Sequence, residues 1–361
     1  MGKSIYLLSA EPYSGKSVII VGLGLKFKDE GYKVGYFKPF GTGTREYDES
    51  GREILRDEDV YSVKQVLGLK EPLEQLCPVL VTTDLVSQIL TNKTEEDFLK
   101  KIVSTFSVVA KDKDLIFIDG VGDCSEGYIF GASCQEIVNQ TKSKVLFVLK
   151  YAGDTSIDAI LSAKEIFKDN FLGAIVNYIP QDKVDYFEKV IVPYLERKKI
   201  EVFALFPKDI LLAAISVKEI VEHLDGRVLC AEDKLNELVE NFVVGAMHPE
   251  QALKYFRKIT DKAVITGGDR ADIQTAALET ATKCLILTGN LTPDSLVLSK
   301  ANELGVPMIL VGYDTFTTVE RIEEISKKIP FHGEKKIERV KKLFAERFDF
   351  KKFKTYVEGK N

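Results

Sequence analysis

Short apolar runs that alternate with amphipathic stretches constrain the fold of this chain more than any other feature. The runs Leu115–Ile118, Lys144–Leu149 and Leu172–Tyr178 are continuous rather than alternating, which is typical of strands that helices bury on both faces. This rhythm predicts an α/β fold built on a doubly wound parallel sheet. Further strands of the same sheet are expected at Ser4–Ser9, Lys33–Lys38 and Val202–Pro207.

The helices expected between these strands are Lys16–Glu30, Asp59–Leu67 and a longer one from Thr94 to about Val109, opened by the capping box Thr94-x-x-Asp97. After residue 207 the alternation restarts on a smaller scale. Strands are expected there at Phe242–Gly245, Ala263–Thr266, Leu285–Thr288 and Met308–Gly312, with capping boxes at Ser216/Glu219 and Thr317/Glu320. We therefore expect a first domain over residues 1–207, a smaller α/β domain over 213–328 and a basic C-terminal helical tail over 331–361.

Composition limits the class of protein. A length of 361 residues predicts two domains, or three small ones. A net charge of −5 excludes the electrostatic footprint of a general nucleic-acid binder. The five cysteines form no C-x-x-C pair, so we expect reduced thiols rather than a disulfide framework or a zinc site. No secretory signal and no apolar stretch of membrane-spanning length is present, so we expect a cytoplasmic protein without a membrane or nucleic-acid partner.

A phosphate-binding loop is indicated where the first strand gives way to the first helix. The octapeptide Ala10–Ser17, AEPYSGKS, matches the P-loop pattern G-x-x-x-x-G-K-[ST] except at Ala10. Gly15 lets the backbone approach phosphate oxygens, Lys16 reaches the outer phosphates and the Ser17 hydroxyl can ligate Mg²⁺. We place Ser14 and Val18 in the same cofactor-binding set, and we expect ATP and Mg²⁺ as cofactors. The alternative is a turn that contains Gly-Lys-Ser by chance.

Acidic residues near such a loop are candidates for the magnesium site. Asp119 directly follows an expected strand, and ligands collect at the carboxyl edge of an open parallel sheet. The alternative for Asp119 is a solvated turn before a glycine. Asp59 lies among other charges, so a helix-capping role is as compatible with the pattern as a metal role.

A lysine ends the second strand, in the segment Lys38-Pro-Phe-Gly-Thr42-Gly43. A cation at this position could hold an anionic substrate group against the γ-phosphate. An exposed strand-end lysine before a turn is the alternative.

Together these motifs make residues 3 to about 205 resemble the dethiobiotin synthetase and cobyrinic acid a,c-diamide synthase group of P-loop enzymes. The resemblance implies that Lys16 and Ser17 take phosphates and metal, that Asp59 and Asp119 complete the Mg²⁺ shell, and that Lys38 and Thr42 face a carboxylate substrate. Lys16, Lys38 and Thr42 are then the expected catalytic residues.

The same resemblance implies that Asn177, in Gly173-Ala-Ile-Val-Asn-Tyr-Ile-Pro180, reads the adenine edge. It also implies a homodimer. The sequence departs from the family at Ala10 and at Asp119, where the synthetases usually carry Glu. A shorter carboxylate can still ligate a metal, but it places the metal differently.

Residues 213 to about 325 resemble the DRTGG domain. The matching stretches are Val244–Met247, Ile265–Gln274, Leu285–Asn290 and Tyr313–Phe316. Two pairs, Asp269 with Arg270 and Thr288 with Gly289, follow neighbouring strands and face one edge. They could form a polar effector site, or they could tie two loops together. Asn290 stands where the family has Gly, and Asn also tolerates left-handed geometry.

The two resemblances occur in the order seen in the N-terminal part of long phosphate acetyltransferases, and the acetyltransferase domain itself is not expected in the residues that remain. This implies a nucleotide-binding regulatory protein that acts on a partner enzyme of acyl-phosphate metabolism. The alternative is an ATP-dependent ligase that activates a small carboxylate as an acyl phosphate. In a third hypothesis the nucleotide is only a structural ligand.

The tail over residues 331–361 carries ten Lys/Arg and five Asp/Glu. Its apolar residues recur at helical spacing, with lysines on the remaining faces. We expect an amphipathic helix that packs on the acidic body of the protein, with Ile337, Val340, Leu343 and Phe344 inward and Lys335, Lys336, Lys341 and Lys342 outward.

Overall fold

A computed structural model describes residues 2–47, 53–120, 122–327 and 333–359. The chain forms two compact units: Met1–Asp209 together with Pro330–Asn361, and Ile210–Ile329. The second unit is therefore an insertion into the first. The tail over residues 331–361 was expected as a separate segment, but it belongs to the first unit because its helices pack there. None of the helices within the described ranges is long and apolar enough to cross a membrane.

A six-stranded parallel sheet forms the centre of the first unit and confirms the predicted doubly wound α/β fold. Its strand order is β10-β9-β8-β1-β7-β2. In β1, residues Ile5 to Leu8 are at most 1% exposed because both faces of the sheet are covered. The strands are β1 (Lys3–Ser9), β2 (Val34–Phe37), β7 (Leu115–Asp119), β8 (Lys144–Lys150), β9 (Phe171–Ile179) and β10 (Val202–Pro207).

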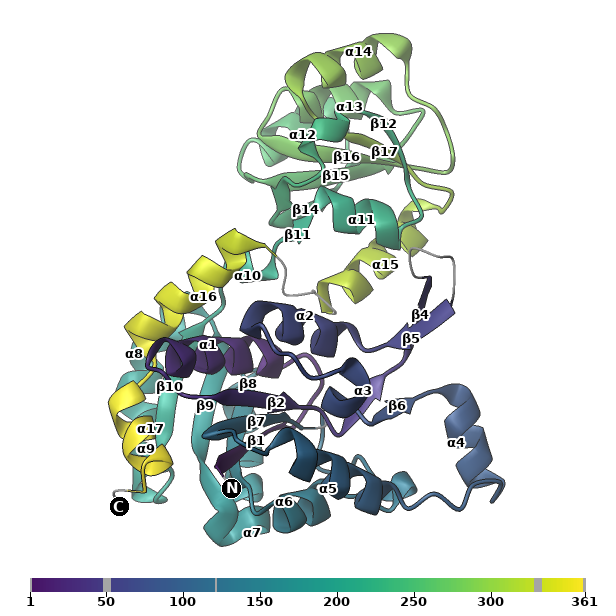
Figure 1. Cartoon of the computed structure of the whole chain (residues 1–361). Coiled ribbons are helices and arrows are strands. Elements are labelled where there is room, and N and C mark those ends of the chain that lie inside the picture. The colour runs from purple at the N-terminus through teal and green to yellow at the C-terminus, as the bar shows by residue number, and fades with distance from the viewer. Residues whose placement is uncertain (1, 48–52, 121, 328–332, 360–361) are drawn as a thin grey trace. The chain divides into compact units, whose positions relative to one another are not determined.

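Helices cover this sheet on both sides (Figure 1). One face carries α1 (Lys16–Asp29) and α2 (Glu58–Leu67), and the other carries α5 (Phe98–Val109), α6 (Cys134–Thr141) and α7 (Asp158–Phe167). Helix α5 begins at Phe98 rather than Thr94, because Asp97 is its N-cap and accepts a hydrogen bond from Lys100 N at 2.9 Å. The predicted capping box Thr94/Asp97 is therefore wrong.

Short elements that the sequence did not indicate lie before α2 and between α2 and α5. Strand β3 (Phe40–Thr42) pairs in parallel with β6 (Val79–Val81), and β4 (Thr44–Tyr47) pairs antiparallel with β5 (Glu53–Arg56). The short helices here are α3 (Leu73–Leu76) and α4 (Thr83–Leu90). Strands of three or four residues carry too little periodicity to be recognised from sequence.

The second unit holds a five-stranded sheet of order β12-β17-β16-β15-β14, in which only the edge strand β12 runs antiparallel among the described strands. Its strands are β12 (Arg227–Cys230), β14 (Asn241–Val244), β15 (Lys262–Gly267), β16 (Thr282–Thr288) and β17 (Met308–Leu310). Its main helices are α11 (Val217–His223), α12 (Pro249–Phe256), α13 (Ala271–Leu278), α14 (Ser295–Leu304) and α15 (Thr315–Lys327).

Two capping boxes were predicted in this unit. The one at Ser216/Glu219 is confirmed, with both reciprocal hydrogen bonds present at the start of α11. The one at Thr317/Glu320 is wrong, because α15 already begins at Thr315 and the Asp314 side chain accepts the hydrogen bond from Thr317 N at 3.0 Å.

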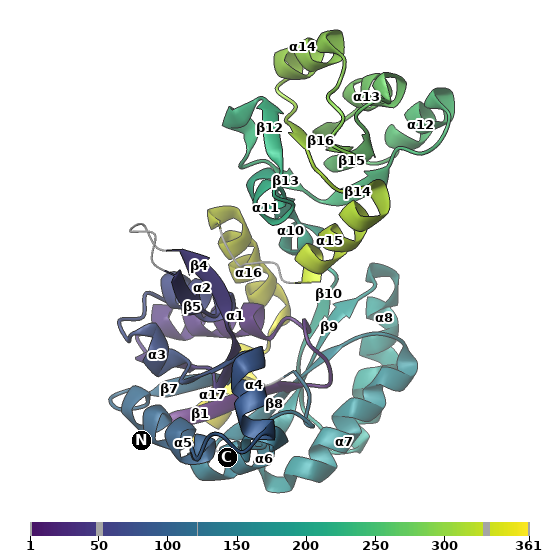
Figure 2. The ribbon, with the colours of Figure 1, turned by 90° about the vertical axis from the view of Figure 1, so that its right-hand side faces the viewer.

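The tail forms α16 (Glu334–Arg347) and α17 (Phe350–Val357), which pack on the first unit beside β10 and α1 (Figures 1 and 2). A Cβ on Gly22 of α1 would lie 2.4 Å from Phe344 Cε2, so the glycine makes room for the ring. Asp349 N donates to Phe203 O of β10 at 2.8 Å. The rings that cluster here are Phe27, Phe203, Phe206, Phe344, Phe348, Phe350 and Phe353.

The predicted inward face of α16 is largely confirmed. Val340, Leu343 and Phe344 are buried and Ile337 is half-buried, while Lys335, Lys341 and Lys342 are exposed. Lys336 was predicted on an outer face but is only 2% exposed. The difference arises because Lys336 lies one turn before Val340 and two turns before Leu343, on the same buried face of α16.

Truncating Phe344 tests whether the tail is part of this core. Phe344→Ala should lower the free energy of unfolding by about 3–5 kcal/mol, because it empties the space above Gly22. Urea unfolding of the full chain measures the loss. The matched control is Leu90→Ala, at a side chain that is 70% exposed on α4, which should change stability by about 0.5 kcal/mol or less. Equal effects of the two changes would contradict the assignment.

Candidate functional site

The predicted site residues of the first unit lie at the carboxyl ends of its parallel strands. β1 lies between β7 and β8 in the sheet, although the chain runs from β1 to β2 first. The strand order therefore reverses beside β1, which is where open α/β sheets bind ligands. The loop Ser9–Ser17 leaves β1 at this point and enters α1.

The loop backbone is shaped by two left-handed residues, Tyr13 with φ 57° and Gly15 with φ 93°. A Cβ on Gly15 would lie 2.4 Å from Asn177 Nδ2, so both conformation and space require glycine. Helix α1 carries no acidic residue in its first turn, which leaves its positive end available to an anion. The Ser14 hydroxyl oxygen is buried and has no hydrogen-bond partner among the described residues.

Lys16 lies over this loop. Its Nζ donates to Ser9 Oγ at 3.0 Å, and the one hydroxyl hydrogen of Ser9 has two acceptors within reach, Glu11 O at 2.8 Å and Gly122 O at 3.0 Å. Burial lowers the pKa of Lys16, partly opposed by the carboxylate of Asp119. A desolvated ammonium group that donates to a neutral hydroxyl can exchange this acceptor for a charged phosphate oxygen, which is the stronger acceptor.

Asp119 lies directly beside the loop, at the end of β7. It accepts hydrogen bonds from Ser17 Oγ at 3.2 Å and from Tyr36 OH at 3.1 Å. Burial raises the pKa of Asp119, opposed by the positive charges of Lys38 and Lys16. A loop hydroxyl beside a strand-end carboxylate is the pair with which P-loop proteins hold Mg²⁺.

No cluster of three or more His, Cys, Asp or Glu side chains within the described ranges could hold a metal ion. The residues nevertheless fit Mg²⁺, because this ion takes only one or two protein ligands and completes its shell with phosphate oxygens and water.

Lys38 is held by two carboxylates. Its Nζ lies 3.0 Å from both Asp57 oxygens and 3.1 Å from Asp59 Oδ2. Burial alone would lower the pKa of Lys38, but the negative charges of Asp59, Asp119 and Asp57 more than offset it and raise the pKa overall. Lys38 therefore stays charged.

Asp57 joins this cluster to the backbone. Its carboxylate caps α2 by accepting from Val60 N at 3.0 Å and also accepts from Thr42 N at 2.7 Å. Thr42 thus takes part through its N–H, while the residue itself is exposed. Sequence reasoning missed Asp57 and chose Asp59, although an Asp just before an expected helix is an N-cap signal.

Asn177 hydrogen-bonds to the backbone of the loop Ser9–Ser17. Its Nδ2 donates to Ser14 O at 2.9 Å and its Oδ1 accepts from Tyr178 N at 2.9 Å. Its expected contact with an adenine edge stays a prediction. Val18 lies half-buried in the first turn of α1.

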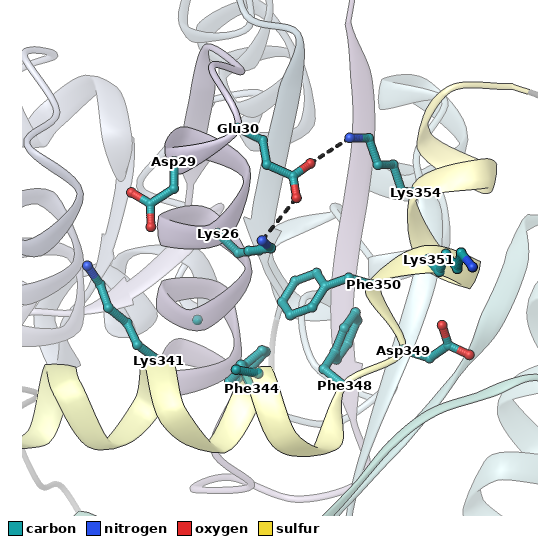
Figure 3. Close-up of a pocket in the computed structure, with 12 residues that line it drawn as sticks. Lys26, Asp29, Glu30, Lys341, Phe344, Phe348, Asp349, Phe350, Lys351 and Lys354 are labelled. Atoms are coloured by element: carbon teal, nitrogen blue, oxygen red, sulfur yellow. Dashed lines mark hydrogen bonds and ion pairs between the residues drawn. The ribbon is translucent and has the colours of Figure 1, made fainter.

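An open groove of about 680 Å³ lies elsewhere on the first unit, between α1 and the tail helices (Figure 3). Phe344, Phe348 and Phe350 line it, and Glu30 bridges Lys26 and Lys354 across it. It contains none of the predicted site residues.

In the second unit, the predicted effector residues lie at the ends of β15 and β16. Arg270 forms a two-point ion pair with Asp272, at 3.0 and 3.1 Å, and Thr288 Oγ1 lies 2.9 Å from Thr315 Oγ1. Gly289 N donates to Tyr313 O at 2.7 Å. The Thr288 and Gly289 contacts tie neighbouring loops together, whereas the Arg270–Asp272 pair is local. The effector role of Asp269, Arg270, Thr288 and Gly289 stays a prediction.

Asn290 adopts φ 55°, the left-handed geometry expected at this position. A Cβ on Gly268 would lie 1.6 Å from Leu291 O, so the two loops pack without room for a side chain.

The two aspartates beside Lys38 should differ sharply when they are replaced. Asp57 is 4% exposed and Asp59 is 49% exposed. Asp57→Ala should cost about 3–5 kcal/mol, because it removes a cap and leaves Lys38 short of a buried partner, whereas Asp59→Ala should cost about 1 kcal/mol or less. Urea unfolding of both variants measures the difference. Similar losses would show that Asp57 does not organise the cluster.

Two family models match the chain: one described as AAA domain over residues 3–216, and one described as DRTGG domain over residues 219–325. The phosphate acetyltransferase of Synechocystis sp. is 23% identical over 99% of this chain and 52% of its own length. The phosphate acetyltransferase of Escherichia coli is 20% identical over 96% of this chain and 51% of its own length. The chain thus spans about half the length of these relatives.

Among solved structures, the MinD cell division protein of Aquifex aeolicus matches with a TM-score of 0.35 and 17% identity, over 58% of this chain and 83% of that one. The CBS and DRTGG domains of the regulatory region of Clostridium perfringens pyrophosphatase, complexed with the activator diadenosine tetraphosphate, match with a TM-score of 0.28 and 22% identity, over 42% of this chain and 72% of that one. TM-scores this low support no conclusion about function.

The first family model covers more than half of the 361 residues, and the relatives align over almost the whole chain. The chain therefore belongs to the P-loop family described as AAA domain, carries a DRTGG domain and is homologous to the N-terminal regions of phosphate acetyltransferases.

Proposed function

We propose that the first unit binds ATP with Mg²⁺ at the loop Ser9–Ser17, and that the chain is a regulatory protein of acyl-phosphate metabolism. One observation carries the nucleotide assignment: Lys16, Ser17 and Asp119 converge beside a left-handed glycine at the start of α1. In this proposal, Lys16 exchanges Ser9 Oγ for a phosphate oxygen, and the unpartnered Ser14 hydroxyl gains an acceptor. Bound Mg²⁺ would supply charge neutralisation between phosphates and Asp119.

The charges around the loop support a metal-bound nucleotide. Two lysines, Lys16 and Lys38, face three aspartates, Asp57, Asp59 and Asp119. A bare anion would gain little at a cluster whose cations are already matched by carboxylates. A nucleotide that arrives with a divalent cation brings the positive charge this cluster needs.

The regulatory role rests on the relatives and on the way the chain is connected. Those relatives are phosphate acetyltransferases, so we propose an enzyme of acyl-phosphate metabolism as the partner. The DRTGG unit interrupts the nucleotide unit between β10 and α16, so two chain segments connect them. A homodimer, implied by the resemblance to the synthetases, stays a prediction.

A ligase is the second candidate, favoured by the position of Lys38. In this alternative, a carboxylate oxygen of a small substrate attacks the γ-phosphorus, ADP leaves and an acyl phosphate forms. Lys38 would have to release Asp59, which is the exposed member of its two partners. Asp57 would keep Lys38 in place.

Removing the Lys16 side chain tests the nucleotide site. Isothermal calorimetry with Mg·ATP should show binding to the native chain and a loss of about tenfold or more in affinity for Lys16→Ala, because a charge-assisted contact to phosphate disappears. At a concentration a hundredfold above Kd, Mg·ATP should also stabilise the native chain by about 2.7 kcal/mol. The matched control is Lys100→Ala, at an exposed lysine of α5, which should bind normally. Equal affinities of the two variants would contradict the site.

Turnover separates the two candidate functions. ATP hydrolysis and phosphate release are followed with Mg²⁺ and a panel of small carboxylates, for the native chain and Lys16→Ala. The regulatory proposal expects no carboxylate-stimulated turnover. Stimulation that depends on Lys16 would overturn it in favour of the ligase.

Hydrogen exchange tests whether the two units communicate. If the nucleotide is a regulatory signal, saturating Mg·ATP should slow amide exchange at the ends of β15 and β16 as well as at the loop Ser9–Ser17, since a coupled ligand changes local opening equilibria. Protection confined to the first unit would contradict a signal that passes between the units.

A further inference from the structure

A pair of thiols lies in the segment that follows Asp119. Cys134 is the first residue of α6, and Cys124 lies ten residues earlier, in a turn. Between them, Gly127 with φ 93° closes a small loop in which Ala132 N donates to Gly127 O at 3.1 Å. The two cysteines therefore stand at the base of one closed loop.

The Cys134 thiol contacts the Cys124 residue. Cys134 Sγ donates to Cys124 O at 3.5 Å. The other three cysteines, Cys77, Cys230 and Cys284, are buried and hydrogen-bond to no cysteine among the described residues. This contact distinguishes the pair from the remaining thiols.

The two partners are unequal in exposure and acidity. Cys124 is half-buried, whereas Cys134 is 1% exposed. The neighbouring Cys134 thiol lowers the pKa of the Cys124 thiol, while Cys124 and burial raise the pKa of Cys134. An accessible, more acidic thiol beside a buried second thiol is the arrangement of redox-sensitive pairs.

The segment that leads into Cys124 also contacts the P-loop lysine through Ser9. Gly122 O lies 3.0 Å from Ser9 Oγ and is one of the two acceptors within reach of its hydrogen, and Ser9 Oγ accepts the hydrogen bond from Lys16 Nζ at 3.0 Å. Gly122 N donates to Glu126 Oε2 at 3.1 Å, two residues beyond Cys124. A change in the backbone at Cys124 therefore reaches Lys16 through these contacts.

We propose that Cys124 and Cys134 form a redox-active dithiol that low-molecular-weight disulfides convert to an intrachain disulfide. The Cys124 thiolate attacks one sulfur of the small disulfide, forms a mixed disulfide and releases one small thiolate. Cys134 then gives its proton to solvent, attacks Cys124 Sγ and displaces the second small thiolate. Two cysteine thiols are oxidised, and one disulfide is reduced to two thiols.

The disulfide is expected to restrain the loop. It fixes the Cα atoms of the two residues at about 4.4–6.8 Å and the dihedral angle about the sulfur bond near 90°. The segment carrying Gly122 and Glu126 then loses its freedom to move when Lys16 turns to a phosphate. The oxidised chain should therefore bind Mg·ATP more weakly, a consequence that rests on the proposed nucleotide site.

The first experiment tests the dithiol alone. The full chain is treated with oxidised glutathione, alkylated and digested, and its peptides are identified by mass spectrometry. We expect a peptide pair joined through Cys124 and Cys134 that dithiothreitol separates. Cys134→Ser should instead retain glutathione on Cys124, and Cys124→Ser should retain none. Cys77→Ser is the matched control and should behave as the native chain. Free Cys124 and Cys134 after treatment, or a glutathione adduct on native Cys124 that never resolves, would overturn the proposal.

The second experiment measures the consequence. Calorimetry should show Mg·ATP binding to the oxidised chain about fivefold or more weaker than to the reduced chain, and the difference should vanish in Cys124→Ser. A disulfide that forms without changing affinity would overturn the link to Lys16 while the dithiol stands. Absence of binding to the reduced chain would contradict the nucleotide site itself, which separates that failure from failure of the dithiol.

Discussion

The burial of helix α1 on several sides is the constraint on which the first unit depends. Two glycines of this helix make it possible. A Cβ on Gly24 would lie 2.9 Å from Leu67 Cδ2 of α2, and one on Gly22 would lie 2.4 Å from Phe344 Cε2 of α16. Side chains at these positions would push two neighbouring helices away. Lys16 and Ser17 are the first two residues of this helix. Close packing at Gly22 and Gly24 therefore also fixes the position of the two site residues.

Much of the architecture could be predicted because it follows from burial. Strands covered on both faces must be apolar throughout, so the runs at β7, β8 and β9 were visible in the sequence. The loop Ser9–Ser17 was visible because its chemistry fixes the spacing of Gly15, Lys16 and Ser17. These features depend on neighbours in the sequence.

The features that escaped prediction depend on contacts between distant residues. Asp57 and Asp59 both stand at the start of α2. Only the approach of Lys38, directly after β2, and of Thr42, at the end of β3, shows that Asp57 is the organising carboxylate. Lys336 has the charge of a surface residue, yet α16 is covered on the side where it lies. The helix starts at Phe98 and Thr315 were missed because several polar residues in each turn could have capped the helix, and the fold uses Asp97 and Asp314.

The insertion of the second unit has a consequence for the order in which the protein folds during synthesis. The six strands of the first unit's central sheet have all been made once residue 207 is added, but the rings that cover α1 and β10 come from residues 344–353. Residues 210–329 are made in between and contain a full core of their own. The inserted unit can therefore fold on the ribosome while its host still exposes the apolar surface around Gly22. The first unit begins to be synthesised before the second, but its core is completed only after the second unit has been made.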